Sequence, residues 1–177
     1  MVNYRRNFIS GGTYFFTVNL ADRHSACLTD NIELLRESFA WVRLARPFQI
    51  DAIVVLPDHL HTIWTLPEDD ADYPGRWRAI KSRFVRRLRA SGYRLASNAR
   101  GECRIWQHRY WEHTIRDQDD FERHADYIHI NPVKHGHTDA PSAWPYSSIH
   151  RYIREGVRNA DWCNATPDEL DGTHGER

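Results

Sequence analysis

The sequence predicts an α+β protein with a ferredoxin-like (split βαβ) antiparallel sheet and helices on one face of that sheet. Short runs with strand alternation and longer segments with helical spacing follow one another in the order strand, helix, strand, strand, helix, strand. Only Pro57 and Asp58 separate the two middle strands, which is typical of a β-hairpin. The chain of 177 residues is long enough for one sizeable core with an appended tail.

Side-chain spacing defines the first four elements. After Gly11-Gly12 the chain alternates so that one face of the first strand is wholly apolar. Thr29-Asp30-Asn31 offers an N-cap for the first helix, and Pro47 stops that helix. The expected elements are a strand over Tyr14–Leu20, a helix over Ile32–Arg46, and a hairpin of Phe48–Leu56 and His59–Leu66.

The second half of the chain adds a basic helix, an aromatic strand and a further helix. Asp117 can cap the latter helix, and Pro132 and Gly136 end it. The expected elements are a helix carrying Trp77, Ile80, Phe84 and Leu88, a loop over Ser91–Glu102, a strand over Trp106–Ile115 and a helix over Gln118–Ile130. We expect residues 1–150 to form one domain and residues 151–177 to form an acidic C-terminal tail.

Composition argues against several classes of protein. No apolar run approaches the roughly 20 residues that a membrane span needs. The N-terminus also lacks the apolar centre of a signal peptide, so we expect a cytoplasmic protein with no membrane partner. Cys27, Cys103 and Cys163 are widely spaced and form no CxxC pattern, which argues against a disulfide framework and against a cysteine zinc site.

The net charge is zero, but the charges are unevenly distributed. Between Tyr73 and Arg104 there are ten Lys or Arg residues and a single acid, Glu102. From Glu155 to the end there are six acids and two arginines. A basic block inside a neutral chain indicates a surface for a polyanion such as a nucleic acid. The alternative interpretation is a solvated helix face without a partner.

Two histidines, His59 and His61, lie one residue apart at the start of the second hairpin strand. On a strand they share a face with Ile63, while Leu60 and Trp64 point to the other face. Imidazoles in this arrangement, roughly 7 Å apart, can hold one divalent cation between them. The alternative is a pair of polar residues on a half-exposed strand.

The helix over Gln118–Ile130 carries a polar stripe beside its apolar face. Tyr127 and Asn131 lie four residues apart on this stripe, so their side chains can reach the same point. If this helix packs beside the paired histidines, His59, His61 and Asn131 surround a metal ion, and Tyr127 points at the phosphate that the ion holds. A phenol can then attack that phosphate. The alternatives are a half-buried tyrosine and a helix-end asparagine.

Four segments resemble the single-tyrosine HUH transposases, and within them the REP-associated tyrosine transposases. They are YRRNFISGGTYFFTVNL, VVLPDHLHTIWTLP, WQHRYWEHTIRDQDDFERHADYIHINPVKHG and WPYSSIHR, which span nearly the whole chain in order. The resemblance implies a catalytic domain that cuts and rejoins single-stranded DNA at repetitive extragenic palindrome (REP) hairpins through a 5′-phosphotyrosine intermediate. It also implies a nucleoid-associated protein.

The resemblance also implies a role for each site residue. His59 and His61 carry the metal-binding HUH motif, Tyr127 is the nucleophile, and Asn131 stands where the family's helix supplies a further ligand. The wider family often has glutamine there. Mg²⁺ or Mn²⁺ is the ion expected for phosphoryl transfer, although imidazole ligands also suit zinc. The expected DNA-binding residues are Tyr4, Arg5, Arg6, Arg78, Lys81, Arg83, Arg86, Arg87, Arg104, Arg109 and Lys134. Candidates for base stacking, each also compatible with the core, are Tyr4, Phe15, Trp106, Tyr110 and Trp111.

Rival interpretations stay open at this point. One is a domesticated hairpin-DNA-binding protein with little turnover, and another is a metal hydrolase that uses water as the nucleophile. A monomer is favoured over a dimer that exchanges its tyrosine helices. The acidic tail after Glu155 either restrains activity by lying near the DNA site or is a solvated end.

Overall fold

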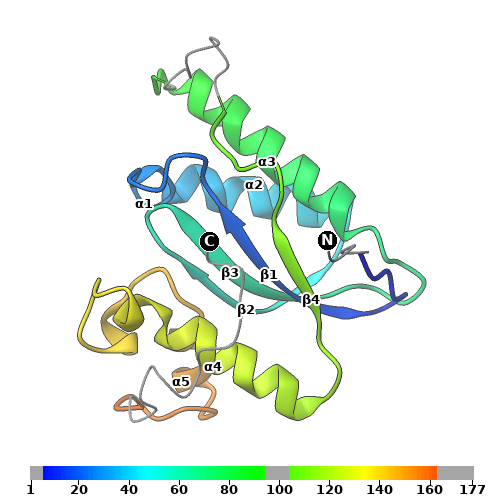
Figure 1. Ribbon diagram of the computed structural model, residues 1–177, viewed down its shortest axis with the longest axis vertical. Helices are drawn as coiled ribbons and strands as arrows, with labels where there is room; N and C mark the ends of the chain where they lie inside the picture. Colours follow the sequence, from blue (N-terminus) through cyan, green and yellow to red (C-terminus); the bar gives the residue numbers. More distant parts are fainter. Residues whose placement is uncertain (1–5, 95–103, 163–177) are drawn as a thin grey trace, which may run out of the picture.

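A four-stranded antiparallel sheet forms the centre of the computed structural model, which describes residues 6–94 and 104–162 (Figure 1). The strand order is β2-β3-β1-β4, and every neighbouring pair is antiparallel, as in the predicted ferredoxin-like arrangement. The strands are β1 (Thr13–Asn19), β2 (Gln49–Val55), β3 (His59–Thr65) and β4 (Trp111–Thr114). The predicted fold class is confirmed.

Helices lie on both sides of this sheet. The helices α2 and α3 cover one face, and α4 covers the other, with α5 beside α4 (Figure 1). The helical elements are α1 (Cys27–Asp30), α2 (Ile32–Ala45), α3 (Tyr73–Ala90), α4 (Gln118–Lys134), the 3₁₀ turn η1 (Pro141–Ala143) and α5 (Ile149–Arg154). The α2/α3 face is the helical layer of the ferredoxin-like unit, and α4 is the additional helix that carries Tyr127.

Strand alternation in β1 builds a separate core on each face. Tyr14 and Phe16 point toward α2 and α3, where the indole rings of Trp64 and Trp77 stack with centroids 4.2 Å apart. Phe15 points the other way and packs with the apolar face of α4. Both sides of β1 are therefore buried, and α4 is fixed against the sheet by its own hydrophobic cluster.

The predicted strand over Trp106–Ile115 is wrong in its extent. Regular pairing with β1 is confined to Trp111–Thr114, and Trp106 makes only an isolated bridge with Leu20. Between them the chain leaves the edge of β1, and Tyr110 packs edge-on against Phe16 and at a tilt to Trp77. Aromatic packing therefore decides the path of this segment where alternation predicts a strand.

The predicted end of α4 is also wrong, because the helix continues through Pro132 to Lys134. Proline removes one N–H donor, but the helical bonding resumes after it: the His135 N–H bonds to the Asn131 carbonyl at 3.0 Å. The helix ends one turn later, where Gly136 has φ +68° and the His137 N–H bonds to the Pro132 carbonyl. Asn131 therefore stays on the helix.

The predicted N-cap forms at α4 but not at α2. The Asp117 carboxylate accepts a hydrogen bond from the Asp120 N–H at 2.8 Å, so the predicted cap of α4 is confirmed. Asn31 occupies the N-cap position of α2, but its side chain donates back to the Cys27 carbonyl of α1. The Asn31 side chain, which the sequence assigns to the cap of α2, therefore bonds to the end of the short helix α1 instead.

The C-terminal segment is attached to the outer edge of β2. Tyr146 and Ser148 exchange backbone hydrogen bonds with Val55 and Ile53, so this segment covers the open edge of the strand. Helix α5 crosses residue 150, and Arg151 donates to the Ile50 carbonyl of β2. The predicted division into residues 1–150 and 151–177 stays a prediction, and residues 163–177 of the tail lie outside the described residues. None of the helices in the described ranges is long and apolar enough to cross a membrane.

Candidate active site and DNA-binding cleft

His59 and His61 lie on β3, an inner strand of the sheet, and point toward α4. Both side chains are buried, with exposures of 1% and 0%, and their ring centroids are 5.0 Å apart. The predicted alternation is confirmed, since Ile63 packs with α4 while Leu60 and Trp64 belong to the opposite core. A half-exposed strand face is therefore excluded. The imidazoles are buried between β3 and α4, and we call this buried group of side chains, with Tyr127 and Asn131, the histidine–tyrosine pocket.

Each imidazole is held through its Nδ1 atom. His59 Nδ1 lies 2.7 Å from Asp58 Oδ1, and His61 Nδ1 lies 2.9 Å from Thr17 Oγ1. Within the described part of the chain, the buried Nε2 atom of His59 has no hydrogen-bond partner. Neutral imidazoles whose Nδ1 atoms are engaged present Nε2 as a metal ligand. The pair therefore fits a divalent cation.

Tyr127 lies directly beside this pair. Its side chain is 1% exposed, and its ring centroid is 5.3 Å from that of His61. The ring also packs edge-on against Phe15 at 6.1 Å, and Lys134 Nζ lies 4.9 Å from the ring centroid. Tertiary packing thus brings the predicted nucleophile and one predicted metal ligand together from segments far apart in the sequence.

Asn131 lies one helical turn beyond Tyr127 and is fully buried. The next residue at this spacing, His135, places its ring 5.1 Å from that of His59. Since Tyr127 neighbours His61 and His135 neighbours His59, Asn131 occupies the turn of α4 between the two imidazoles. Sequence reasoning did not assign His135 to this pocket, although its distance of four residues from Asn131 was a usable signal.

Asp58 is an additional charged group in the pocket. Burial would raise the pKa of its carboxyl, but the hydrogen bond with His59 and the charge of Arg23 oppose burial and hold the pKa below its usual value. Arg23 Nε lies 3.1 Å from Asp58 Oδ2. Sequence reasoning treated Asp58 as a turn residue only, because a carboxylate beside a proline is typical of turns.

A second cluster of possible ligands lies at the start of α4. Among the described residues, His113, Asp120 and His124 bring three ligand atoms within 4.8 Å of one another, as a metal site would. However, Asp120 Oδ2 already lies 2.8 Å from His113 Nε2 and 3.3 Å from Arg116 Nε, and Oδ1 lies 3.4 Å from an Arg123 nitrogen. Two guanidinium groups oppose a cation there, so we interpret the cluster as an ion-pair network.

The same network stabilises the ionised form of Asp120. Its side chain is 2% exposed, and burial alone would raise the pKa of the carboxyl. Hydrogen bonds from His113 and from the Arg116 backbone, with the charges of His113 and His124, lower the pKa far below its usual value. The carboxylate therefore joins the end of β4 to the first turn of α4, four residues before His124 and seven before Tyr127.

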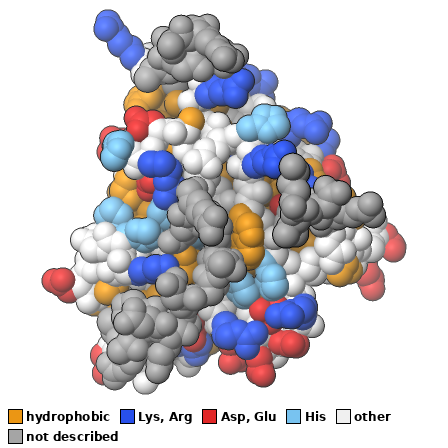
Figure 2. Space-filling view, in the orientation of Figure 1, with side chains coloured by type: hydrophobic (Ala, Val, Ile, Leu, Met, Phe, Trp, Pro, Cys, Tyr) orange, Lys and Arg blue, Asp and Glu red, His pale blue; other side chains and the backbone are white. Residues whose placement is uncertain are grey.

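A basic cleft runs between α3 and residues 104–110. It consists of two pockets of about 640 Å³ and about 340 Å³ that share Lys81 and His108 in their walls. Lys and Arg side chains, blue in Figure 2, are prominent in its upper part, where α3 lies. The cleft is lined by five of the predicted DNA-binding residues: Arg6, Arg78, Lys81, Arg86 and Arg104.

Lys81 is the most buried cation of this cleft. Its ammonium donates to the Gln107 carbonyl at 3.3 Å and lies 5.3 Å and 5.5 Å from the ring centroids of Tyr110 and Trp106. Burial, and secondarily the charge of Arg6, lowers the pKa of Lys81 to about 8. The cleft thus combines an adjustable positive charge with aromatic walls.

The other predicted DNA-binding residues lie elsewhere. On the far side of α3, the Arg83 guanidinium lies over Trp41 at 4.5 Å, and Arg87 pairs with Glu37 of α2 at 2.8 Å. The basic block is therefore divided between two sides of one helix. Arg109 is exposed, and Lys134 belongs to the tyrosine pocket. Tyr4 and Arg5 lie outside the described residues.

The stacking candidates divide in a similar way. Phe15 is fully buried between His61, His124 and Tyr127, so its interpretation as a base-stacking residue is wrong. Trp106 is 8% exposed, and Tyr110 is partly buried at the cleft. Trp111 packs on the core beneath α4. Of the stacking candidates within the described ranges, Tyr110 and the small exposed part of Trp106 remain available to a base in the cleft.

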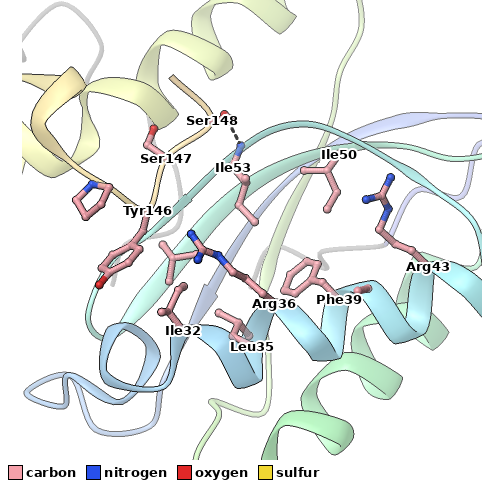
Figure 3. A pocket seen from close by; sticks show the side chains of 13 residues that line it. Ile32, Leu35, Arg36, Phe39, Arg43, Ile50, Ile53, Tyr146, Ser147 and Ser148 are labelled. Atoms are coloured by element: carbon pink, nitrogen blue, oxygen red, sulfur yellow. Dashed lines mark hydrogen bonds between the residues drawn. The ribbon is translucent and has the colours of Figure 1, made fainter. Parts of the chain in front are cut away.

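An apolar pocket of about 310 Å³ lies between α2 and the edge of β2 (Figure 3). Ile32, Leu35 and Phe39 of α2 point into it, opposite Ile53 of β2. At its rim Arg36 pairs with Glu33, and Arg43 donates to the Phe48 carbonyl. None of the predicted catalytic or DNA-binding residues lines this pocket, so it is separate from both sites.

Comparisons with known proteins agree with this arrangement. No protein-family model matches the chain. A REP-associated tyrosine transposase of Escherichia coli (strain K12) is 47% identical over 177 residues, which is 100% of this chain and 98% of the relative. A chain of the same family name from Haemophilus influenzae is 43% identical and covers 95% of this chain and 96% of its own. A solved REP-associated tyrosine transposase bound to a REP hairpin aligns with a TM-score of 0.87 and 46% identity, over 100% of this chain and 98% of that one.

Proposed function

Since the chain belongs to the REP-associated tyrosine transposases, we propose that it binds REP hairpins and cuts and rejoins the adjoining single-stranded DNA through a 5′-phosphotyrosine intermediate. The observation that supports the chemistry is the 5.3 Å approach of the Tyr127 and His61 rings. A phenol beside two imidazoles that present Nε2 is a suitable arrangement for attack on a phosphodiester.

In the proposed step one phosphoester bond, to the DNA 3′-oxygen, is exchanged for another, to the Tyr127 oxygen. The Tyr127 hydroxyl oxygen attacks the scissile phosphorus and gives up its proton to water. The bond to the 3′-oxygen breaks and that oxygen takes up a proton from water, which yields a free 3′-hydroxyl and a 5′-phosphate joined to Tyr127. The Lys134 ammonium over the ring favours negative charge on this side chain. Attack by a 3′-hydroxyl on the phosphotyrosine reverses the step and rejoins DNA without an external energy source.

His59, His61 and Asn131 would hold the divalent cation. When bound, Mg²⁺ or Mn²⁺ polarises the scissile phosphate and neutralises its developing charge. The buried position of both histidines excludes bulk water, which strengthens each electrostatic interaction in the pocket. All three ligands are neutral, so the cation's charge is left available to the substrate.

The basic cleft would hold the hairpin through its phosphates. Arg78, Arg86 and Arg104 supply positive charge at the cleft walls, and Tyr110 offers a ring for an unpaired base. We expect a monomer to be sufficient, since Tyr127 reaches His61 of its own chain.

The test is a denaturing gel after incubation with a labelled REP hairpin oligonucleotide and Mn²⁺. Wild-type protein should give a covalent protein–DNA adduct and a product with a free 3′-hydroxyl. Tyr127→Phe should lower cleavage by roughly 10³-fold or more and abolish the adduct, with hairpin affinity unchanged. Tyr146→Phe, at a partly buried tyrosine outside the pocket, is the matched control.

Two results would overturn the proposal. Cleavage without an adduct in the wild type would assign the attack to water and make the protein a metal hydrolase. Tight hairpin binding without cleavage, under conditions in which the metal binds, would make it a binding protein with little turnover.

A further inference from the structure

Residues outside the pair of histidines contact both imidazoles. We propose that Asp58, held in place by Arg23, is a positioning residue that fixes the Nε2-presenting form of His59, and that Thr17 is a positioning residue that holds the ring of His61 beside it, for one divalent cation. The inference rests on the proposed function, because it concerns the same pocket. It assigns to these three residues a role in metal affinity, without contact to the metal or the DNA.

The Asp58 contact determines the tautomer of His59. An ionised carboxylate can only accept hydrogen bonds, so the 2.7 Å contact requires a proton on His59 Nδ1. In the neutral ring the lone pair is then on Nε2, the buried atom without a partner among the described residues. A carboxylate behind a metal-binding imidazole also makes the ligand more basic.

Arg23 prevents this carboxylate from turning away. Asp58 Oδ1 contacts His59, while Oδ2 lies 3.1 Å from Arg23 Nε, so both oxygens are engaged. Arg23 in turn donates to Asn19 Oδ1 at 2.7 Å, and Asn19 is the residue of β1 directly opposite His59. The side chains of Asp58 and Arg23 are 14% and 31% exposed, so solvent competes only in part. The ion pair thus joins the turn before β3 to the end of β1.

Thr17 holds the His61 ring in place through the sheet itself. In the β1–β3 register Thr17 and His61 are direct partners, and both side chains are fully buried. The contact of 2.9 Å is therefore built into the strand pairing. Because a hydroxyl can donate as well as accept, this contact orients the ring without setting its tautomer, so we expect Thr17 to contribute less than Asp58.

The experiment measures Mn²⁺ affinity by calorimetry on the full chain and, separately, the imidazole tautomers of the metal-free protein by long-range ¹H–¹⁵N NMR. Wild-type His59 should carry its proton on Nδ1. Asp58→Asn should weaken Mn²⁺ binding by about 10- to 100-fold, and Arg23→Gln and Thr17→Val by about tenfold or less. Asp58→Glu should restore part of the affinity. Asp30→Asn and Thr29→Val, outside the pocket, should have no effect.

Measurements of cleavage and of hairpin binding show whether Asp58→Asn acts through metal affinity or through the structure. Saturating Mn²⁺ should return Asp58→Asn cleavage to near the wild-type rate, and hairpin affinity without metal should not change. A merely structural role for Asp58 would lower thermal stability and leave the His59 tautomer as it is.

Separate outcomes would overturn the inference and the proposed function. Unchanged Mn²⁺ affinity in Asp58→Asn, or a proton on Nε2 of His59 in the wild type, overturns the inference alone. If neither the wild type nor His61→Gln binds Mn²⁺ in the pocket, the proposed function fails, while the NMR measurement still decides whether Asp58 sets the tautomer.

Discussion

The histidine–tyrosine pocket and the basic cleft differ in burial. In the pocket, His59, His61 and Tyr127 are at most 1% exposed, and each has a neighbour at a defined distance. In the cleft, Arg78 and Arg86 are exposed and lie along an open wall of α3. The pocket is built by tertiary packing between β3 and α4, and the cleft is built by the charge of one helix.

Because of this difference, we expect the pocket to control cleavage and the cleft to control DNA affinity. A buried constellation depends on every member, because one displaced group leaves its buried partners unsatisfied. Exposed cations on a polyanion site act nearly independently, and each is screened by salt. We therefore expect substitutions in the pocket to change cleavage by orders of magnitude, and single substitutions in the cleft to change binding modestly.

The largest effect should come from the metal ligands. His61→Gln removes a ligand of an ion that supplies several kcal/mol of transition-state stabilisation, so cleavage should fall by about 10³-fold or more. Single-turnover cleavage with Mn²⁺ measures this, and EDTA should reproduce the loss in the wild type while hairpin binding persists. His24→Gln, at an exposed histidine, is the control. If Asp120→Asn abolished Mn²⁺-dependent cleavage and His61→Gln did not, the ion would instead belong to the cluster of His113, Asp120 and His124.

A smaller effect should distinguish the two sides of α3. The double variant Lys81→Met/Arg86→Gln removes two cations from the cleft and should lower hairpin affinity about tenfold. The slope of log affinity against log salt should fall by about 2, roughly one per lost phosphate contact. Arg83→Gln/Arg87→Gln removes two cations from the same helix on the side of Trp41 and Glu37, and should leave the slope unchanged. Equal slopes for the two variants would contradict a cleft-specific site.

The smallest effect on activity, with a measurable effect on stability, should come from Asp120→Asn. Replacing a buried carboxylate that accepts several hydrogen bonds should lower the free energy of unfolding by about 1–3 kcal/mol at pH 7. The pKa of Asp120 lies below that of an unfolded aspartate, so this stability is present above about pH 4 and is lost as the pH falls further. Urea unfolding at pH 7 and pH 3 measures it, and the difference between wild type and variant should shrink at pH 3.

The neighbouring residue provides the control for that prediction. Asp119 is exposed in the same helical turn, and Asp119→Asn should cost less, because a solvated carboxylate near a helix N-terminus contributes only about 0.3–1 kcal/mol. Equal losses for both variants would show that Asp120 acts only through the helix dipole.

The sequence by itself determined the order of the elements, the shared strand face of His59 and His61, and the shared helix side of Tyr127 and Asn131. These features depend on local periodicity, which a sequence displays directly. It also located the basic block, because charge density needs no fold. Periodicity did not place the end of α4, since local rules cannot show that the bonding resumes beyond Pro132.

Tertiary structure alone decided which of these features meet. The approach of Tyr127 to His61, the division of the basic residues between the cleft and α2, and the contacts of Asp58 with Arg23 all join segments that no short-range pattern relates. The reason is physical: helix and strand spacing fix the direction of a side chain relative to its own element. Which elements pack together depends on burying the two apolar faces of the sheet, and that is a property of the whole chain.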